Sequence, residues 1–486
     1  MIRHYLLFRA DGNSKIGYGH VMRLLALAEI VRSDFDICFI IKETAAWLKN
    51  QIAGQYLLLD IPPDSTVDEE IKFLSEYSPG NSHIIILDGY CFDTYYQTSL
   101  REVVGIKVVS IDDFQPFKYS ADAVINHAGF LNPEQFEKEE YTKLFLGPEY
   151  ALLRNDFNEA AKLPAKVNQE CKTVFICSGG TRPEIFNQIL NDLVRRKVTR
   201  ILIVLSNTEK SEKYRSVSES VETYSDLSAK QMIELMGQSD FAVLPASTLC
   251  YEYSSVSGGL FVIKTAENQK YIYDFIIESG CGFSYEDFDS IFESPDLISK
   301  FNSQRARQRQ YFSGNNVLNL QKEIFKIALF DRIELRKATT DDLMFHFHLA
   351  NDEDARRNSF NPQPISLETH KLWYQAKLSN SDSSLYVLWA ENLPLGNIRF
   401  DFTGENALLS YSVDRRFRNN GLGSAMLIKG IQLILKEYSG IKLINGYVNK
   451  KNIASINSFA KAGFIINNDA PKHFEDYDYY SLNITR

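Results

Sequence analysis

The sequence predicts an α/β protein made of three successive units. Short β-rich runs alternate with helical patterns from the start of the chain, and the alternation resumes after a polar interruption. A third unit with a different residue pattern follows. Strands separated by helices indicate parallel sheets, because parallel neighbours need a long crossover connection. The length of 486 residues agrees with about three domains at roughly 150 residues each.

The first unit is predicted at residues 1–158. Its apolar runs have the length of strands, and amphipathic helical patterns separate them. The predicted strands are 5–9, 36–41, 56–60, 83–88, 107–111 and 123–126. A polar stretch from Asn155 to Lys166 interrupts the alternation, and the first boundary is placed within it.

A second α/β unit is predicted at residues 159–330. An amphipathic helix over 314–330 closes it, with apolar residues at a spacing of about 3.6. The predicted strands are 173–177, 200–205, 241–244 and 260–264. Two successive α/β units of this kind suggest a ligand cleft between them.

The third unit is predicted at residues 331–486. It opens on an alternating strand at 333–338, and residues 339–342 then offer N-cap side chains for a helix. Further along, 407–413 has a strand pattern and Ser424 begins a helical one.

Composition and charge exclude several classes of protein. With 44% hydrophobic and 24% charged residues, the chain is neither disordered nor fibrous. Its net charge is −9 and no lysine- or arginine-rich run stands out, so we expect no nucleic-acid partner. The apolar runs are far shorter than the ~20 residues that span a bilayer, and no signal-peptide pattern is present, so we expect a cytoplasmic protein without membrane association.

The cysteines predict neither disulfides nor a structural metal site. There are six of them and no CxxC pair. Several, such as Cys38, lie within apolar runs and are expected to be small buried hydrophobic residues.

A glycine-rich loop follows the first predicted strand. Gly17 and Gly19 precede His20, and an amphipathic helical pattern begins directly afterwards. Glycines at such a junction let backbone N–H groups approach a phosphate, and the helix N-terminus favours negative charge. There the helix dipole would keep the His20 ring neutral and able to accept a proton. The alternative is a tight turn with a surface histidine.

Polar loops follow other predicted strands, at the edge where open α/β sheets bind ligands. Residues 178–181 form a second loop suited to a phosphate, and 245–252 offer hydroxyls and then the carboxylate of Glu252, which suits a ribose diol. Segments 88–90, 112–113 and 266–269 also follow strands. Several such loops in two neighbouring units point to a nucleotide-type ligand.

Residues 1 to about 320 resemble the UDP-sugar hydrolases of pseudaminic acid biosynthesis. The matching stretches, in the same order, are 17–23, 88–90, 112–113, 146–154, 178–181, 246–252 and 266–269. The resemblance implies a glycosyltransferase-B-like architecture of two Rossmann-like domains. It also implies release of UDP from UDP-2,4-diacetamido-2,4,6-trideoxy-β-L-altropyranose.

The same resemblance implies roles for individual residues. His20 would be the general base that activates water for inverting-type attack on the anomeric carbon, with UDP leaving and no metal. The implied sugar-binding residues are Gly17, Gly19, Tyr90, Asn268 and Gln269. The implied UDP-binding residues are Ser178, Gly179, Gly180, Thr181, Ser247, Thr248 and Glu252. Two positions depart from the family pattern, Arg182 after the second loop and Pro245 before Ser247.

A glycine loop in the third unit, 418–423, lies between a predicted strand and a predicted helix, where backbone N–H groups can converge on a pyrophosphate. Its Arg-x-x-Gly-x-Gly spacing, with the Gly-Phe that ends segment 452–464, resembles the GCN5-related N-acetyltransferase (GNAT) superfamily. The resemblance implies acetyl-CoA as cosubstrate. The implied contacts are Val413, Arg418, Asn420, Gly421, Leu422, Gly423, Ser424 and Asn452.

Residues 333–486 are also similar to the 4-amino-sugar N-acetyltransferases of the same pathway. The similarity is carried by 336–338, 351–352, 358–360 and 396–400. It implies acetyl transfer to the 4-amine of a UDP-linked 4-amino-4,6-dideoxy sugar. That amine must lose a proton before it attacks, and the leaving thiolate needs one.

The proton donor of the third unit is left open by the sequence. The superfamily often has a tyrosine at the position of Phe459, and phenylalanine cannot donate a proton. Either Tyr411 or Tyr447 serves, or solvent does. His346, His348 and His370 lie on predicted helices and are expected to be structural or surface residues.

Together these features predict a bifunctional enzyme that acetylates a UDP-amino sugar and then hydrolyses the product to free sugar and UDP. Two alternatives stay open. A UDP-sugar glycosyltransferase fused to an acetyltransferase would leave the UDP-sugar intact without an acceptor. A non-catalytic nucleotide-sugar scaffold would keep all its activity after His20→Ala. The sequence predicts no oligomeric state.

Overall fold

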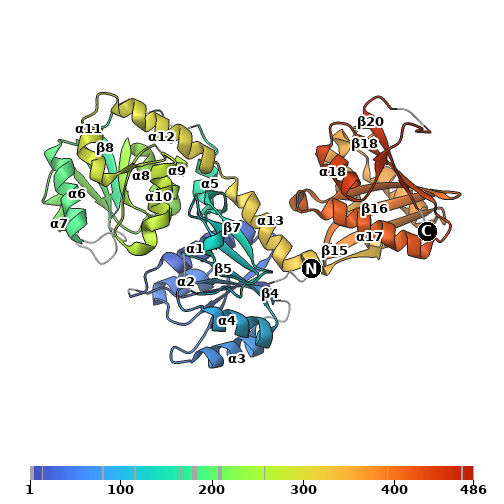
Figure 1. Ribbon diagram of the computed structural model, residues 1–486, viewed down its shortest axis with the longest axis horizontal. Coiled ribbons are helices and arrows are strands. Elements are labelled where there is room, and N and C mark those ends of the chain that lie inside the picture. The colour runs from blue at the N-terminus through green and yellow to red at the C-terminus, as the bar shows by residue number, and fades with distance from the viewer. Residues whose placement is uncertain are drawn as a thin grey trace. The chain divides into compact units, whose positions relative to one another are not determined.

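The structure is a computed structural model that describes residues 5–13, 15–78, 82–113, 117–164, 167, 169–177, 183–205, 211–256, 258–390, 392–471 and 474–484. Contacts divide the chain into two compact units, with the division between Gln321 and Lys322. The division falls inside helix α13 (Asn316–Leu329), and each unit is described by itself (Figure 1).

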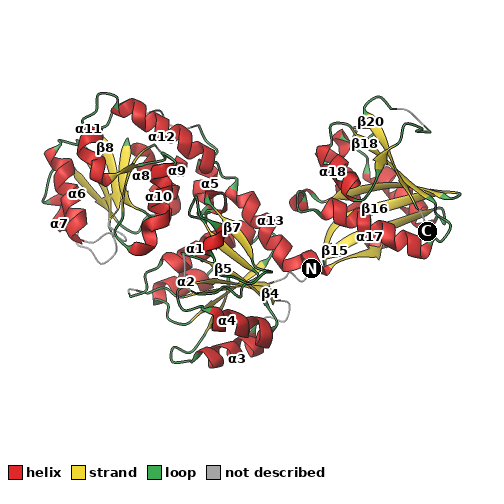
Figure 2. Ribbon diagram, viewed as in Figure 1, coloured by secondary structure: helices red, strands yellow, loops and turns green. Residues whose placement is uncertain are grey.

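The N-terminal unit contains two parallel sheets, each in a lobe of its own (Figure 2). The first lobe has seven parallel strands in the order β3-β2-β1-β4-β5-β6-β7. Its strands are β1 (Tyr5–Ala10), β2 (Asp36–Ile41), β3 (Leu57–Asp60), β4 (Ser82–Asp88), β5 (Lys107–Ile111), β6 (Ala123–Asn126) and β7 (Lys143–Leu146). Its helices are α1 (Gly19–Val31), α2 (Ala46–Ala53), α3 (Val67–Tyr77) and α4 (Thr94–Ser99).

The second lobe has six parallel strands in the order β10-β9-β8-β11-β12-β13. They are β8 (Thr173–Cys177), β9 (Arg200–Val204), β10 (Val221–Tyr224), β11 (Phe241–Pro245), β12 (Gly259–Ile263) and β13 (Phe283–Ser284). The helices are α5 (Asn155–Ala160), α6 (Pro183–Arg195), α7 (Ser211–Arg215), α8 (Ala229–Gln238), α9 (Thr248–Val256), α10 (Lys270–Glu278), α11 (Phe288–Phe292) and α12 (Leu297–Tyr311). Parallel sheets in both lobes confirm the prediction from alternating strands and helices.

The cores follow from the continuous apolar runs of the central strands. Ile84, Ile85 and Ile86 of β4 are fully buried, as expected of a parallel strand covered on both faces. Cys38 of β2 is also fully buried. Near the end of the unit, α13 is joined to the first lobe through Gln321, whose Nε2 donates to the carbonyl of Ile30 at 2.7 Å.

The strand order places a ligand crevice in each lobe. In the first lobe the chain reverses direction across the sheet between β1 and β4, and in the second between β8 and β11. Such reversals open a crevice outside the carboxyl ends of the strands. The loops after β1, β4, β5 and β6 are therefore neighbours, although they are far apart in the sequence.

The C-terminal unit is built on a seven-stranded mixed sheet in the order β14-β15-β16-β17-β18-β20-β19. Its strands are β14 (Ile333–Lys337), β15 (Ser383–Ala390), β16 (Leu393–Thr403), β17 (Asn406–Val413), β18 (Leu443–Asn449), β19 (Ile465–Ile466) and β20 (Tyr477–Asn483). Its helices are α14 (Leu343–Ala350), α15 (Glu353–Arg357), α16 (Leu367–Ser379), α17 (Leu422–Glu437) and α18 (Ile453–Lys461).

Strands β17 and β18 of this sheet are parallel and pair only at one end. Residues 406–408 are in register with 443–445, and beyond that point the two strands have no paired residues. A gap therefore opens in the middle of the sheet.

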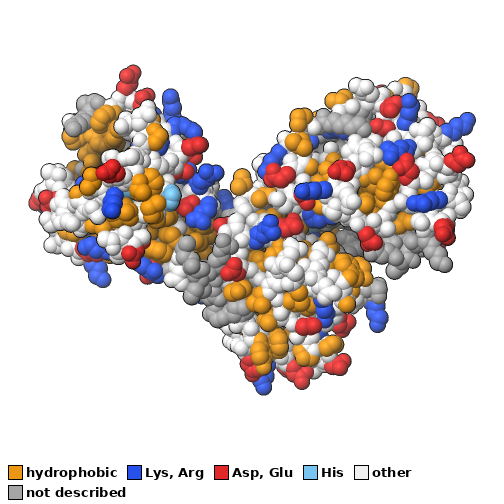
Figure 3. Space-filling model, turned by 180° about the vertical axis from the view of Figure 1, so that it is seen from behind, with side chains coloured by type: hydrophobic (Ala, Val, Ile, Leu, Met, Phe, Trp, Pro, Cys, Tyr) orange, Lys and Arg blue, Asp and Glu red, His pale blue; other side chains and the backbone are white. Residues whose placement is uncertain are grey.

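The surface carries both signs of charge. On the face drawn in Figure 3, acidic and basic side chains are interspersed, so the net charge of −9 is not gathered there into one patch. Among the helices that the structure describes, none is both long and apolar enough to cross a bilayer.

Candidate active sites

The glycine loop after β1 places His20 in the first turn of α1. Gly17 adopts a φ of +89°, a left-handed conformation that favours glycine, and its amide donates to the carbonyl of Asn13 at 2.8 Å. Gly19 is the first residue of α1. The His20 residue is only 6% exposed, so the alternative of a surface histidine does not hold.

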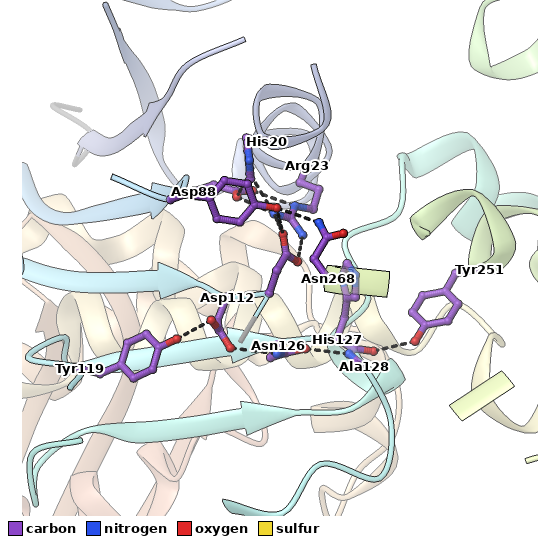
Figure 4. A network of polar contacts seen from close by, with 12 residues as sticks. His20, Arg23, Asp88, Asp112, Tyr119, Asn126, His127, Ala128, Tyr251 and Asn268 are labelled. Carbon is purple, nitrogen blue, oxygen red and sulfur yellow. Dashed lines mark hydrogen bonds and ion pairs between the residues drawn. The ribbon is translucent and has the colours of Figure 1, made fainter. Parts of the chain in front are cut away.

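His20 belongs to a network of charged side chains at the carboxyl ends of the strands (Figure 4). Its Nδ1 lies 2.6 Å from Oδ1 of Asp88, the last residue of β4. The Arg23 guanidinium, one turn further along α1, donates to both Asp88 oxygens at 2.7 and 2.9 Å. It also donates to both oxygens of Asp113, at 2.5 and 2.9 Å.

The network determines which nitrogen of His20 can act as a base. A carboxylate only accepts hydrogen bonds, so the His20 Nδ1 must carry the proton that it shares with Asp88. Arg23 Nη2 is also 3.1 Å from this nitrogen, but it lies closer to Asp88, the better acceptor. In the neutral ring, Nε2 is then left with a free lone pair.

Arg23 keeps the centre of the network charged. Burial alone would raise the pKa of Asp113, but the adjacent Arg23 guanidinium outweighs this effect and lowers the pKa to about 2. Burial works against the charge on Arg23 as well, yet Asp113 and Asp88 raise its pKa above the usual value. His20 therefore sits beside a permanently ionised arginine–aspartate pair.

Tyr90 and Asn268 come from different lobes and meet beside His20. Asn268 Nδ2 donates to the Tyr90 hydroxyl at 2.9 Å, and the rings of Tyr90 and His20 pack edge to face with centroids 4.8 Å apart. Half of the Tyr90 surface is exposed. The structure thus brings together three side chains that lie up to 248 positions apart in the sequence.

Two of the residues predicted to bind UDP lie at the start of α9. Ser247 precedes this helix and Thr248 is its first residue, so the N-terminal backbone amides lie at both. The loop 178–181 lies outside the described residues. Gln269, predicted to contact the sugar, accepts through Oε1 from the Thr265 amide at 2.7 Å, and its ligand contact remains a prediction.

Glu252, predicted to bind the ribose, lies one turn further along α9 and is buried. Its two carboxylate oxygens accept from Arg154, Oε1 from Nε at 2.7 Å and Oε2 from Nη2 at 2.8 Å.

The C-terminal unit holds a cavity of about 1150 Å³ where β17 and β18 diverge. Most residues predicted to act here line it, namely Tyr411, Val413, Arg418, Gly421, Leu422, Gly423, Ser424, Tyr447 and Asn452. Asn420 is buried, and its Oδ1 has no hydrogen-bond partner within the described part of the chain. The cavity is large enough for an extended ligand.

Two glycines shape the loop before α17. Gly421 has a φ of +77° and is the N-cap of the helix, so the backbone amides of the first turn are free of intrahelical partners. At Gly423, an added Cβ would lie 2.8 Å from Ser458 Oγ and 3.3 Å from the Tyr411 hydroxyl. The close approach of the loop to β17 and α18 therefore requires a glycine there.

Arg418 is held within the protein. Its Nη2 lies 2.6 Å from Asp352 Oδ1, its Nη1 lies 2.9 Å from Asp354 Oδ2, and its Nε donates to the carbonyl of Val413 at 3.0 Å. Asp352 is also the N-cap of α15. The arginine thus ties the loop to β17 and α15, and its contact with a ligand remains a prediction.

The two candidate phenols have different surroundings. The Tyr411 hydroxyl is 2.9 Å from Ser455 Oγ on α18, and burial raises the pKa of Tyr411. Tyr447 packs in an aromatic cluster against Phe360 and Phe474, with centroids 5.5 and 5.4 Å away. Phe459 is buried, and its ring forms part of the cavity lining.

Comparison with known proteins identifies the family of the C-terminal unit. Residues 332–465 match the family described as acetyltransferase (GNAT) domain. The chain contains a GNAT domain. This confirms the fold expected from the loop at 418–423 and from the Gly-Phe landmark.

The N-terminal region is homologous to a UDP-sugar hydrolase, and two further relatives match the chain. A UDP-2,4-diacetamido-2,4,6-trideoxy-beta-L-altropyranose hydrolase of Campylobacter jejuni is 26% identical over 288 residues, which cover 58% of this chain and 99% of that one. The spore coat polysaccharide biosynthesis protein SpsG of Bacillus subtilis is 23% identical over 277 residues, 54% of this chain and 77% of that one. An uncharacterized protein of Methanocaldococcus jannaschii is 22% identical over 479 residues, 93% and 95% of the two chains. The chain thus joins a hydrolase-like region to a GNAT domain.

Sequence reasoning missed several residues of the hydrolase-like region. Asp88 is predicted only as part of a segment that follows a strand and Arg23 only as part of a matching stretch, although the spacing of three between His20 and Arg23 puts both on one helix face. His127 follows β6 and is buried near Arg23, and no described residue is a hydrogen-bond partner of its Nε2. No local sequence pattern marks it.

In the GNAT domain, two of the three helical histidines line the cavity. His346 and His370 are buried there, and Asn397 Nδ2 lies 2.7 Å from His346 Nδ1. Because an amide nitrogen only donates, the His346 ring must carry its proton on Nε2. His348 is exposed and does not line the cavity.

Acid should destabilise both parts of the protein, because His127 and His346 are buried and uncharged. Burial, together with the nearby Arg23, lowers the pKa of His127 to about 4, and burial, together with His370 and Arg399, lowers that of His346 to about 3. In the unfolded chain both titrate near 6.5. Below that pH the unfolded state binds more protons, so stability falls with pH toward the folded pKa values.

We expect each of these histidines to cost about 2 kcal/mol of unfolding free energy between pH 7.5 and pH 5. Urea denaturation at the two pH values measures the loss. In the His127→Asn variant, the hydrolase-like region should lose about 2 kcal/mol less unfolding free energy between the two pH values than it does in wild type. An identical pH dependence in wild type and variant would contradict the expectation.

Proposed function

We propose that the chain is a bifunctional enzyme that acetylates the 4-amine of a UDP-linked 4-amino-4,6-dideoxy sugar and then hydrolyses the UDP-2,4-diacetamido-2,4,6-trideoxy sugar. The domains proposed are 1–158 and 159–330, which form a glycosyltransferase-B-like hydrolase, and 331–486. The observation that carries the hydrolase is the His20–Asp88 pair beside Tyr90 and Asn268, in a region homologous to such an enzyme. The GNAT domain supports the acetylation step.

In the hydrolase, His20 Nε2 takes a proton from water as the water oxygen bonds to the anomeric carbon. The bond from that carbon to the phosphate oxygen breaks, and UDP leaves with inversion. Asp88 holds the ring by its Nδ1–H and stabilises the imidazolium that forms, as carboxylates do in other histidine bases. The helix N-terminus at Ser247 and Thr248 receives the diphosphate charge, so the proposed step uses no metal.

In the GNAT domain, the residues around the cavity fit acetyl-CoA. The free amides at Gly421–Ser424 suit its pyrophosphate, and the gap between β17 and β18 gives room for the extended chain. When bound, acetyl-CoA supplies an activated acetyl group that the sugar amine attacks. We assign the proton that the leaving thiolate receives to the Tyr411 hydroxyl, which lies beside Gly423 and Ser455. The proton that the amine loses passes to solvent, and solvent restores the hydroxyl.

The test is mass spectrometry of the products formed from acetyl-CoA and the UDP-4-amino sugar in ¹⁸O-labelled water. We expect free diacetamido sugar that carries the label, together with unlabelled UDP. Label in UDP would mean attack at phosphorus and would exclude the proposed role of His20. An intact UDP-diacetamido sugar after hours without an acceptor would favour a glycosyltransferase instead.

Tyr411→Phe should lower kcat of acetylation by about 10²- to 10³-fold, because the change removes the proton donor and keeps the ring. The matched control is Tyr447→Phe, which removes a hydroxyl within the aromatic cluster and should cost much less. Steady-state kinetics with both variants decide between the two phenols. The reverse order of effects would move the proton donor to Tyr447, and equal small effects would leave solvent as the donor.

A further inference from the structure

Four aromatic side chains gather in the wall of the GNAT cavity, and we call them the aromatic cluster. Phe360 lies in the loop between α15 and α16, and Tyr447 lies on β18. Phe474 precedes β20, and Tyr477 is the first residue of that strand. The centroid of the Phe360 ring is 4.3 Å from that of Phe474, 4.5 Å from that of Tyr477 and 5.5 Å from that of Tyr447.

Phe360 is the most exposed ring of the aromatic cluster. It is 55% exposed, and the neighbouring Phe474 is 37% exposed. Phe360 also lines the cavity, together with Tyr447 and Tyr477. Apolar surface that stays in water costs free energy, and an aromatic patch beside a cavity is typical of a ligand site. A flat ring that stacks on Phe360 would cover this surface.

The charge of the cavity lining favours an anionic ligand. Among the described residues that line the cavity, one is acidic, Asp354, and four are basic, Arg356, Arg399, Arg418 and Lys461. The acid is already paired, since Asp354 Oδ2 accepts from Arg418 Nη1 at 2.9 Å. An excess of positive charge attracts anions and repels acceptors that carry several ammonium groups, such as polyamines.

Arg356 connects this positive charge to the aromatic cluster. Its Nη1 donates to the carbonyl of Asn361 at 3.1 Å, and its Nη2 donates to Ser359 Oγ at 3.1 Å. The guanidinium therefore holds both chain neighbours of Phe360. Within the described part of the chain, no carboxylate pairs with Arg356, and burial lowers its pKa without an opposing effect. Its charge is left for an anion beside the Phe360 ring.

A nucleoside diphosphate combines the two parts that these features fit. Its base is flat and stacks on aromatic rings, and its diphosphate carries negative charge a short distance away. We propose that the aromatic cluster binds the nucleobase of the acetyl acceptor, with Phe360 as the stacking platform, and that Arg356 faces the acceptor's diphosphate. The inference rests on the proposed acetylation of a UDP-linked sugar and names the residues of the GNAT domain that recognise its UDP part.

The test compares two acceptors with the full-length protein, the UDP-linked 4-amino sugar and the 1-phosphate of the same amino sugar, which lacks uridine. Thiol release from acetyl-CoA gives kcat and KM for each. Wild type should have a kcat/KM about 5- to 100-fold higher for the UDP-linked acceptor, the usual effect of one base stacked on an aromatic ring. Phe360→Ala should remove most of this ratio by raising KM for the UDP-linked acceptor, with little change for the 1-phosphate.

Conservative variants separate stacking from apolar packing. Phe360→Tyr keeps the ring and should keep the ratio, whereas Phe360→Leu keeps apolar volume without a flat π face and should lose it. The matched control is Phe402, which does not line the cavity. Its ring lies 4.4 Å from that of Tyr438 at an angle of 33°, close to the 4.3 Å and 33° between Phe360 and Phe474. Phe402→Ala should leave the ratio unchanged.

Two variants of Arg356 test its part. Arg356→Met removes the charge, and KM for the UDP-linked acceptor should rise about 10- to 100-fold, the usual range for a hydrogen bond to a charged group. Arg356→Lys keeps a charge that can bind phosphate, so its KM should rise much less. Equal increases in the two variants would mean that Arg356 only holds the loop.

Several results would overturn the inference. An equal loss with both acceptors in Phe360→Ala would mean a structural role, and an unchanged ratio would place the base elsewhere. A ratio that survives in Phe360→Leu, or falls in Phe402→Ala, would exclude stacking on Phe360. A higher kcat/KM for spermidine than for the UDP-linked acceptor would contradict the charge argument.

Failure of the inference differs from failure of the proposed function. If wild type acetylates both acceptors equally well, the acetylation stands and the nucleotide site in the GNAT domain is removed. If wild type acetylates neither, the proposed acetylation is wrong and the inference falls with it.

Discussion

His20→Ala is expected to lower kcat of UDP-sugar hydrolysis by about 10²- to 10⁴-fold, the usual contribution of a positioned general base. The reason is that Nε2 of this ring is the acceptor left free by the Asp88 contact at 2.6 Å. Acetylation of the amino sugar should be unchanged, because the described residues that line the GNAT cavity all lie beyond position 345. Separate assays of UDP release and of free thiol measure the two activities on one preparation.

Two further variants control this result. Asp88→Asn keeps the volume of the side chain but can present an N–H to His20, which favours the wrong tautomer, so hydrolysis should also fall. His348→Ala removes an exposed histidine and should change neither activity. If His20→Ala hydrolyses the sugar at the wild-type rate, the ring is not the base and the hydrolase mechanism is wrong.

Gly421→Asp is expected to raise KM for acetyl-CoA by more than 100-fold. The residue is the N-cap of α17 with a φ of +77°, where the free amides of the first turn would face the pyrophosphate. An aspartate carboxylate there would take those amides for itself and repel the diphosphate. Hydrolysis of the UDP-sugar should be unaffected.

The matched control is Gly421→Asn, which has nearly the same shape, adopts the left-handed conformation as readily, and carries no charge. Its KM should rise by a much smaller factor, so the difference between the two variants reports the charge alone. Steady-state kinetics over a range of acetyl-CoA concentrations measures both. Equal KM values in the two variants would place the pyrophosphate elsewhere.

The central strands could be predicted because their signal is local. The apolar runs at 36–41, 107–111 and 123–126 have the same bounds in the structure as in the prediction. Strands β7, β10 and β13 were missed: all three lie at sheet edges and are two to four residues long, and β10 and β13 contain no run of apolar residues. Such edge strands are held by their neighbours more than by their own pattern.

The glycine loops could also be predicted, because a left-handed residue at a strand-to-helix junction demands glycine and leaves a visible motif. Gly17 and Gly421, both with positive φ, were found in this way. The partners of the reactive side chains were harder to find. Arg418 has the expected place in its motif, yet it pairs with Asp352, which lies 66 residues earlier.

By itself, the sequence determined the α/β class, the order of the units, the two glycine loops and the candidates His20 and Tyr411, since each depends on a short stretch of residues. Only the tertiary structure decided which side chains meet. The sheet order puts β1 beside β4, and this brings Asp88 to His20 across 68 positions of the chain. Helix α5 likewise brings Arg154 to Glu252 across 98. Such pairs depend on the register and crossing of whole elements, which no local pattern encodes.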